Sequence, residues 1–482
     1  MKNKAGLIAV LVALLSIGFY ITINHAKRID QKNDTRYVRY EAHSKEAKKH
    51  LEAMERAMRI MKSMSCDNPL SWYYQSAIHW IPDTINNNKF CGSYNNVSQI
   101  KDGWDNCTHS PSGKEKLHFL IWHRLYIWHF EKIVRKLSGY NEFALPYWGY
   151  TNQSAMYKTL PEIFRDEKSS LYEPCRFDSL NYGHPISGEI NRSLDLNKLF
   201  SYTDYHLFSN NINAAPHGAM HDYIGAGNDV TGNLRFENEV TGTITSTGLM
   251  GWVPTAAFDP IFWLHHSNID RLWQQWTNSP NGKAAMLSEL KDSPWPYVFF
   301  DENGKRVEYT IEEALDIAYG EMDYDFDDTK LIPKELNTLV KIDNKLVIAK
   351  RATPITINSQ ITDAVTQVIR KPNPNKKLVV EVTISYDKKP KGVYELYMNK
   401  SDRGRFENTN GSFVGFMNFF GSDHKMQGDL CNKGCCQETI NKRPVTKFIF
   451  EIPYAESFNF TVYKHNGKHS ANIKLEKIIV KQ

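Results

Sequence analysis

The sequence predicts a mainly α-helical bundle core followed by a C-terminal β-sandwich-like domain. Apolar residues recur at helical spacing in four stretches between about residues 41 and 276. After about residue 340, β-branched and polar residues alternate instead, as strands require. An uncharged apolar segment precedes both regions. We therefore expect an N-terminal segment over 1–30, a helical domain over 35–335 and a β-domain over 340–482.

The N-terminal segment "AGLIAVLVALLSIGFYITIN" covers residues 5–24 and follows Lys2 and Lys4. Its length is close to the roughly 20 apolar residues that cross a bilayer. No small-residue cleavage site follows it. We expect an export signal or, preferably, an uncleaved membrane anchor, with the rest of the chain in the cell envelope.

Four helices are expected in the core. The first runs from Glu41 to Met64, with methionines on its apolar face. The second is "LHFLIWHRLYIWHFEKIVRKLSG", which Gly139 ends. The third lies around "HGAMHDYIG", and the fourth runs from Pro260 to about Trp276, with Asp259 before it as a cap.

The β-domain is predicted by the runs "KLVVEVTISY", "VYELYM", "KFIFEI" and "NFTVYK". The boundary between the two domains is expected between Ile332 and Leu346, where lysines and a proline gather.

Composition excludes some partners. Lys+Arg 59 against Asp+Glu 54 gives a net charge of +5, without the basic block that nucleic-acid binding would need. The seven cysteines, an odd number, cannot all form disulfides within one chain. In an exported protein Cys66, Cys91 and Cys175 can contribute to disulfides, although the sequence does not give the pairing.

Two adjacent histidines stand in the fourth helix, within "DPIFWLHHSNIDRLW". Neighbouring helical residues point about 100° apart, so His265 and His266 are not expected to aim at the same point. His266 shares its face with Phe262 and Trp273 and is the more inward of the two. The alternative for a single such residue is a core histidine bonded to the backbone.

Other histidines favour a metal site. His217 and His221 are four residues apart, so on a helix both rings reach one ion; two exposed helical histidines are the alternative. His266 would complete a group of three, and His79, His109 and His123 form a second such group upstream. Imidazole ligands suit copper or zinc. A copper pair can transfer two electrons to O2, whereas a dizinc hydrolase would be expected to recruit carboxylates.

The stretches "FLIWHRLYIWHFE" and "DPIFWLHHSNID" resemble the two copper motifs of the type 3 copper proteins, the family of tyrosinases, catechol oxidases and haemocyanins. The resemblance runs in order from about residue 40 to 280 and includes "ALPYWGY" and "PHGAMH". It implies a dicopper catalytic domain over 35–335. The implied ligands are His79, His109 and His123 for copper A, and His217, His221 and His266 for copper B.

The same resemblance implies roles for residues around the ligands. Asp270, four residues after His266, follows the family pattern, and both Asp270 and His265 would support the ligands from behind. Cys107 in "CTH" matches members whose cysteine is linked through a thioether to the second ligand, here His109; a thiol or a disulfide is the alternative. His109 and His123 are farther apart than usual, with "SPSGKEK" as an inserted loop, so His118 is a rival ligand.

The resemblance implies oxidation of o-diphenols to o-quinones with reduction of O2 to water, and in tyrosinases also o-hydroxylation of monophenols. Many tyrosinases carry asparagine directly after the first copper B ligand, where this chain has Gly218, and "FSNNINAAPH" lacks an upstream glutamate. Monophenol activity is therefore the less expected of the two. Val253 matches the gate position over the coppers.

The β-domain resembles those of plant-type polyphenol oxidases, with "GSFVGFMNFFG" as its central part, and such domains can shield the copper site. Cys431, Cys435 and Cys436, with His424 nearby, are expected either to pair in disulfides or to deliver copper. The alternative functions are reversible O2 binding, as in haemocyanins, and a dedicated phenol oxidase of secondary metabolism.

Overall fold

The computed structural model describes residues 36–79, 117–188, 190–226, 235–238, 240, 242–285, 290, 297–331, 346–347, 367–368, 376–400, 412–422, 439–440, 443–453, 457–464, 471 and 473–481. Val38–Gln482 form one compact unit. In the described part of the chain no helix is long and apolar enough to cross a membrane. The N-terminal segment 1–30 lies outside the described residues.

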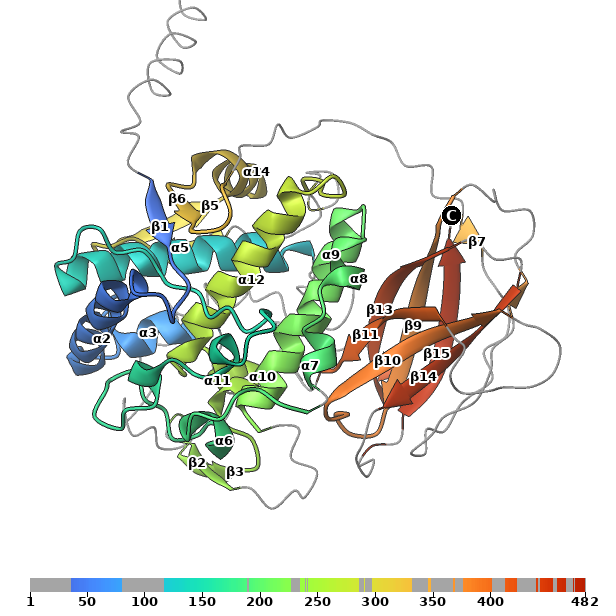
Figure 1. Cartoon of the computed structure of the whole chain (residues 1–482), viewed down its shortest axis with the longest axis horizontal. Helices are drawn as coiled ribbons and strands as arrows, with labels where there is room; N and C mark the ends of the chain where they lie inside the picture. The colour runs from blue at the N-terminus through green and yellow to red at the C-terminus, as the bar shows by residue number, and fades with distance from the viewer. Residues whose placement is uncertain are drawn as a thin grey trace, which may run out of the picture. The chain divides into compact units, whose positions relative to one another are not determined.

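The helical region is built around two long helices, α5 (Phe119–Ser138) and α12 (Ile261–Asn278), which pack against each other (Figure 1). The rings of Phe130 and Trp263 stack between them, with 3.5 Å between centroids. The remaining helices and helical turns are α2 (Ala47–Ser63), α3 (Trp72–Ala77), η2 (Met156–Lys158), η3 (Glu162–Phe164), α6 (Asp178–Asn181), α7 (Ile190–Ser193), α8 (Asn197–Phe200), α9 (Tyr205–Ile212), η4 (Asn213–Gly218), α10 (Ala219–Ile224), η5 (Leu249–Gly251), α11 (Val253–Ala256), α14 (Ile311–Asp316) and η6 (Ile317–Glu321).

The four expected helices are all present, with changed ends. The first begins at Ala47 instead of Glu41, where the Ser44 hydroxyl accepts a hydrogen bond from the Ala47 N–H. Gly139 ends α5 in the left-handed region, with φ 69°, as expected. Asp259 accepts a hydrogen bond from the Ile261 N–H at the start of α12. The third helix is shorter than expected, because a π-helical turn, η4, precedes α10.

Short strands accompany the helices: β1 (Tyr37–Arg39), β2 (Phe236–Asn238), β3 (Thr243–Thr245), β4 (Tyr297–Phe300), β5 (Arg306–Tyr309) and β6 (Tyr324–Phe326). At the end of β1, Arg39 lies fully buried between Glu131 of α5 and Asp270 of α12, with nitrogen–oxygen distances of 2.8 and 2.9 Å. These two ion pairs fix the two long helices relative to each other.

The C-terminal region contains two antiparallel sheets, with strand orders β11-β10-β14-β8 and β12-β13-β9-β15-β7 (Figure 1). Their strands are β7 (Leu346–Val347), β8 (Gln367–Val368), β9 (Leu378–Tyr386), β10 (Val393–Lys400), β11 (Ser412–Asn418), β12 (Thr439–Ile440), β13 (Arg443–Ile452), β14 (Ser457–Lys464) and β15 (Ile473–Lys481). All four expected strands are confirmed. Side chains from both sheets share one apolar cluster, to which β9 contributes alternate residues such as Val380, Val382 and Ile384.

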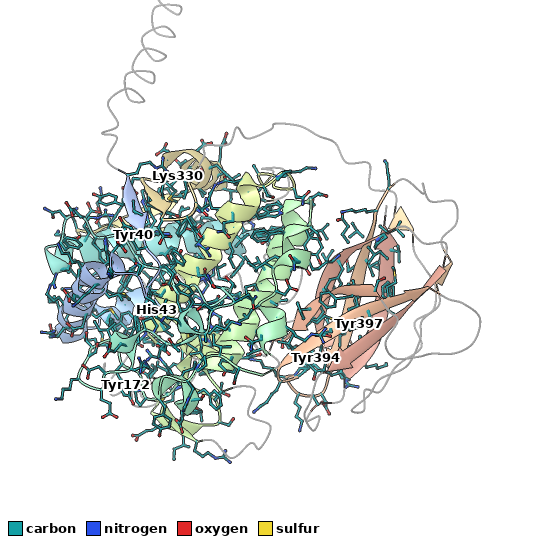
Figure 2. All side chains as sticks on the ribbon, viewed as in Figure 1. Tyr40, His43, Tyr172, Lys330, Tyr394 and Tyr397 are labelled. Carbon is teal, nitrogen blue, oxygen red and sulfur yellow. The ribbon has the colours of Figure 1, made fainter. Side chains whose placement is uncertain are left out.

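The sheets contact the helical region through polar side chains. The Asn211 amide of α9 donates to the Ile449 carbonyl of β13 at 2.9 Å. Arg192 pairs with Glu395 of β10 at 3.1 Å. It also donates to the hydroxyl of Tyr397 on the same strand, the tyrosine that Figure 2 labels. The β region is therefore packed against the helices by specific contacts.

The cysteines differ from expectation at one position. Cys66 is disulfide-bonded. Cys175, expected as a contributor to disulfides, instead keeps a buried thiol that donates to the Glu237 carbonyl at 3.1 Å. Cys91, Cys107, Cys431, Cys435 and Cys436 lie outside the described residues, as does His424.

Candidate metal centre

Six buried histidines from different parts of the chain converge inside the helical region. His79 follows α3, His123 is on α5, and His217 and His221 come from η4 and α10. The remaining two, His265 and His266, are on α12. Every one of these side chains is at most 3% exposed. Burying six imidazoles together costs free energy unless their ring nitrogens have hydrogen-bond partners or bind a metal ion.

Four of them form a compact group. His217, His221, His265 and His266 each offer one ring nitrogen, and these four atoms all lie within 4.8 Å of one another. The centroids of the His217 and His221 rings are 4.5 Å apart, as expected for positions i and i+4 at a helix start. This group contains no carboxylate, and within the described residues it is the one cluster with metal-ligand geometry.

His79 and His123 adjoin this group on one side. Their ring centroids are 5.6 Å apart. The His123 ring is stacked on His266, with 4.3 Å between centroids and 8° between planes, and His79 is 6.5 Å from the same ring. His266 therefore lies between the two sets of histidines.

Backbone carbonyls fix the orientation of four rings. The Nδ1 atoms of His79, His123, His217 and His221 are 2.8–3.2 Å from the carbonyls of Val253, Phe119, Asn213 and Met250, respectively. A carbonyl only accepts, so each Nδ1 carries the proton and each Nε2 carries the lone pair. Carbonyl contacts of this kind typically orient histidines that bind metal ions.

Four of the inward nitrogens have no hydrogen-bond partner among the described residues. Nε2 of His221, Nε2 of His265 and both ring nitrogens of His266 are buried without one in the part of the chain that the structure describes. Burial lowers the pKa of His217 to about 3 and holds the pKa values of His221 and His266 well below the usual range. The rings are thus neutral near pH 7, which is the form that binds metal ions. These residues fit a metal held only by imidazoles.

His265 lies closer to the centre than the helical-face argument predicts. One of its ring nitrogens belongs to the group of four. Its ring centroid is 5.3 Å from that of His217 and 4.7 Å from that of His221. On the other side of the ring, Nδ1 is 2.9 Å from the Tyr150 hydroxyl. Side-chain torsions bring both adjacent residues inward, which a simple 100° rotation about the helix axis does not anticipate.

Among the described residues, the Asp270 carboxylate accepts hydrogen bonds from two arginines and a tyrosine, not from His266. Arg39 donates to it at 2.9 Å, Arg124 at 2.5 Å, and Tyr324 donates through its hydroxyl. Because Arg124 follows His123, this carboxylate joins the two histidine-bearing helices. Its influence on the histidines is therefore exerted through helix positions.

The other sequence-predicted residues are placed as follows. Val253 is fully buried, and its carbonyl holds His79. The rival ligand His118 is at the start of α5, where its Nδ1 is 2.7 Å from the Tyr297 hydroxyl. His109 and Cys107 lie outside the described residues.

The β region also reaches the histidines, through a residue that the sequence alone did not single out. The Phe420 ring is stacked on His221, with 4.2 Å between centroids and 15° between planes, and lies 5.8 Å from His217. The Lys389 Nζ atom, also from the β region, lies over the Phe420 ring, 5.3 Å from its centroid. Phe420 is in the motif "GSFVGFMNFFG", but no spacing rule indicates which residue of the motif would reach the site.

Comparisons with known proteins agree with this geometry. Residues 69–190 and 188–279 match the family model for the common central domain of tyrosinase. The tyrosinase HcTyr1 of Hahella sp. (strain CCB-MM4) is 31% identical over 283 residues, covering 54% of this chain and 57% of the relative. The chloroplastic polyphenol oxidase of Malus domestica is 27% identical over 398 residues, covering 72% and 62%. The chain thus spans less than two thirds of the length of these curated relatives.

Solved structures share the fold. A latent apple tyrosinase superimposes with a TM-score of 0.59 at 19% identity, covering 93% of this chain and 98% of that one. A latent aurone synthase, a polyphenol oxidase, gives 0.58 at 17% identity, covering 93% and 90%. The family match extends over the four histidine-bearing elements described above. Residues 69–279 of the chain therefore form a central domain of the tyrosinase family.

Proposed function

We propose that the chain is a copper-dependent oxidoreductase that converts o-diphenols to o-quinones while reducing O2 to water. The observation that carries this proposal is the meeting of two histidine sets in one buried, carboxylate-free centre. A pair of copper ions supplies the two-electron exchange with O2 that imidazole-bound zinc does not provide. The polyphenol oxidase of Malus domestica and the tyrosinase of Hahella sp. support the assignment to this reaction class.

The proposed ligand sets follow the two histidine groups. Copper A would be held by His79 and His123, with His109 as the third ligand outside the described residues. Copper B would be held by His217, His221 and His266. The proposed thioether between Cys107 and His109 would restrict the rotation of that ring, as the carbonyls restrict the others.

The surrounding residues maintain this arrangement. The carbonyls of Val253, Phe119, Asn213 and Met250 keep four lone pairs directed inward. Tyr150 contacts His265 from behind, so His265 is proposed to support the site while His266, which adjoins both sets, acts as a ligand. Asp270 supports both helices through its arginine partners. Catalysis thus depends on the metal centre, with no further protein group assigned to it.

We propose that residues 340–482 form a β-sandwich that shields a catalytic domain of residues 35–335. The apolar cluster shared by the two sheets supports the sandwich. Phe420 supports the shielding role, because its ring covers one face of His221 in the manner of a bound aromatic molecule. A phenolic substrate that approaches copper B from this face must displace Phe420.

Diphenols are proposed over monophenols. A monophenol must lose its phenolic proton before it is hydroxylated, which requires a base at the site. The position after His217 is Gly218, which has no side chain, and the histidine group contains no carboxylate. Val253 remains the proposed gate residue.

Location is a separate proposal. We propose that residues 1–30 are a signal or membrane anchor that places the catalytic domain in the cell envelope. Their apolar composition alone supports this proposal.

Oxygen uptake by the copper-loaded chain tests the proposed function. With 4-methylcatechol and the variant Phe420→Gly, which removes the shielding ring, we expect one O2 to be consumed for two catechols and the quinone to appear. Reversible O2 binding by the same variant without turnover would instead favour the haemocyanin-like function. Absence of both would contradict the assignment of a dicopper centre.

A further inference from the structure

We propose that Asn418 is a positioning residue that holds the β region closed over the histidine centre, and that glycine at position 218 is what admits it. That the closed state shields a copper site rests on the proposed function. The contact that holds the closed state does not depend on it. This contact is between Asn418, at the end of β11, and the turn that carries His217.

The Asn418 side chain joins two features of the site. It is buried, and its Nδ2 donates to the Asp222 carboxylate at 2.8 Å. Asp222 directly follows His221. The Oδ1 atom accepts a hydrogen bond from the Phe420 N–H at 2.7 Å. One amide therefore connects the helix that bears His221 to the backbone of the residue whose ring covers His221.

Gly218 provides the space for this amide. A Cβ atom at position 218 would lie 2.6 Å from Asn418 Oδ1 and 3.0 Å from the Asn213 carbonyl. The first distance is well inside van der Waals contact, so any side chain at this position must displace Asn418. The backbone does not itself require glycine, because φ and ψ at Gly218 are −61° and −34°, ordinary helical values.

The consequence concerns Phe420. With Asn418 displaced, Phe420 loses the hydrogen bond that sets its backbone, and its stacking on His221 is no longer enforced. A cavity of about 210 Å³, lined by residues that include Asp222, Trp252, Lys389 and Lys391, lies beside this contact. Small reagents can thus reach the edge of the closed site and enter once the ring moves.

A second asparagine provides a matched control. Asn211 also donates its amide across the boundary between helices and sheets, to the Ile449 carbonyl at 2.9 Å. That contact is made to β13, not to the stretch that carries Phe420. Asn211→Ala therefore weakens docking of the β region in general, whereas Asn418→Ala removes the specific link.

The test measures how fast diethyl pyrocarbonate modifies His221 in the metal-free full chain, followed peptide by peptide in a mass spectrometer. The exposed His184 is the internal standard, and the buried His129 reports loss of the fold. Because no copper is involved, the result can be interpreted whether or not the chain oxidises catechols.

We expect Asn418→Ala and Gly218→Ala each to accelerate modification of His221 by about tenfold or more, since both release the same local closure. Asn211→Ala should change the rate by less than about threefold. Equal acceleration by Asn211→Ala, or an unchanged rate in Gly218→Ala, would overturn the proposal. Acceleration at His129 as well as His221 would assign the effect to unfolding and would also overturn it.

Discussion

The ring of Phe420 lies parallel to the imidazole of His221, with 4.2 Å between their centroids and 15° between their planes. The two residues belong to different regions of the chain, the C-terminal sheets and the helical core. An aromatic ring already stacks on a histidine of the candidate copper centre, so the covered face is closed to a second ring. Through this contact, a residue of the C-terminal region restricts access to the centre on which the expected activity depends.

Removal of the shielding ring should raise activity. We expect Phe420→Gly to increase kcat/KM of the copper-loaded chain for 4-methylcatechol by about fivefold or more, because the substrate no longer displaces a stacked ring worth about 1 kcal/mol or more. The control is Phe413→Gly. Phe413 is in β11 and its ring contacts Tyr397 and Phe416, so this variant should leave kcat/KM unchanged. Equal increases in both variants would point to general loosening of the β region.

The two adjacent histidines should differ in copper content. We expect His266→Ala to lower the copper content of the reconstituted chain by about one ion, because this ring adjoins both histidine sets. His265→Ala should retain both ions with weaker binding, of the order of tenfold, since it removes a supporting ring. The measurement is metal analysis after dialysis. The reverse outcome would identify His265 as the ligand.

Asp270 should be essential to stability. The substitution Asp270→Asn leaves Arg124 buried without its counter-charge and removes one of the two carboxylates that pair with Arg39, so we expect a loss of about 3–5 kcal/mol in the free energy of unfolding. Asp328→Asn, which removes the partner of Arg271 at a site 40% exposed, should cost less than about 1 kcal/mol. Urea unfolding of the metal-free variants measures both values, and similar losses would contradict the proposed role of Asp270.

Stability should fall in acid partly because of His129. Burial lowers the pKa of His129 to about 3 from the usual 6.5. Below pH 6.5 the unfolded chain binds a proton there that the folded chain does not, so acidification favours unfolding until about pH 3. In this window His129→Gln should reduce the slope of unfolding free energy against pH by about 1.4 kcal/mol per unit. His184→Gln, at an exposed position, is the control. An unchanged slope in His129→Gln would contradict the prediction.

The sequence predicts those parts of the site that depend on local geometry. His217 and His221 come together because one helical turn separates them, and His266 is inward because its face of α12 is apolar. The strands of the β region are likewise indicated by alternation, as in Val380 and Val382.

What the sequence does not predict depends on contacts between distant elements. Phe420 and Asn418 reach the histidines only because the β region docks at η4 and α10, and no local pattern gives that arrangement. The carbonyl partners of the rings belong to the backbone, so residue identity does not reveal them. The nearness of His265 depends on side-chain torsions that spacing alone does not specify.

The copper content of the full chain tests the central claim most directly. Purified metal-free protein is titrated with copper, dialysed and analysed for metal and protein on the same sample, with oxygen uptake on 4-methylcatechol measured in parallel on Phe420→Gly. We expect two coppers per chain, and quinone formation only when both are bound. A chain that retains no copper, or that oxidises catechol at full rate with a single copper, would contradict this expectation.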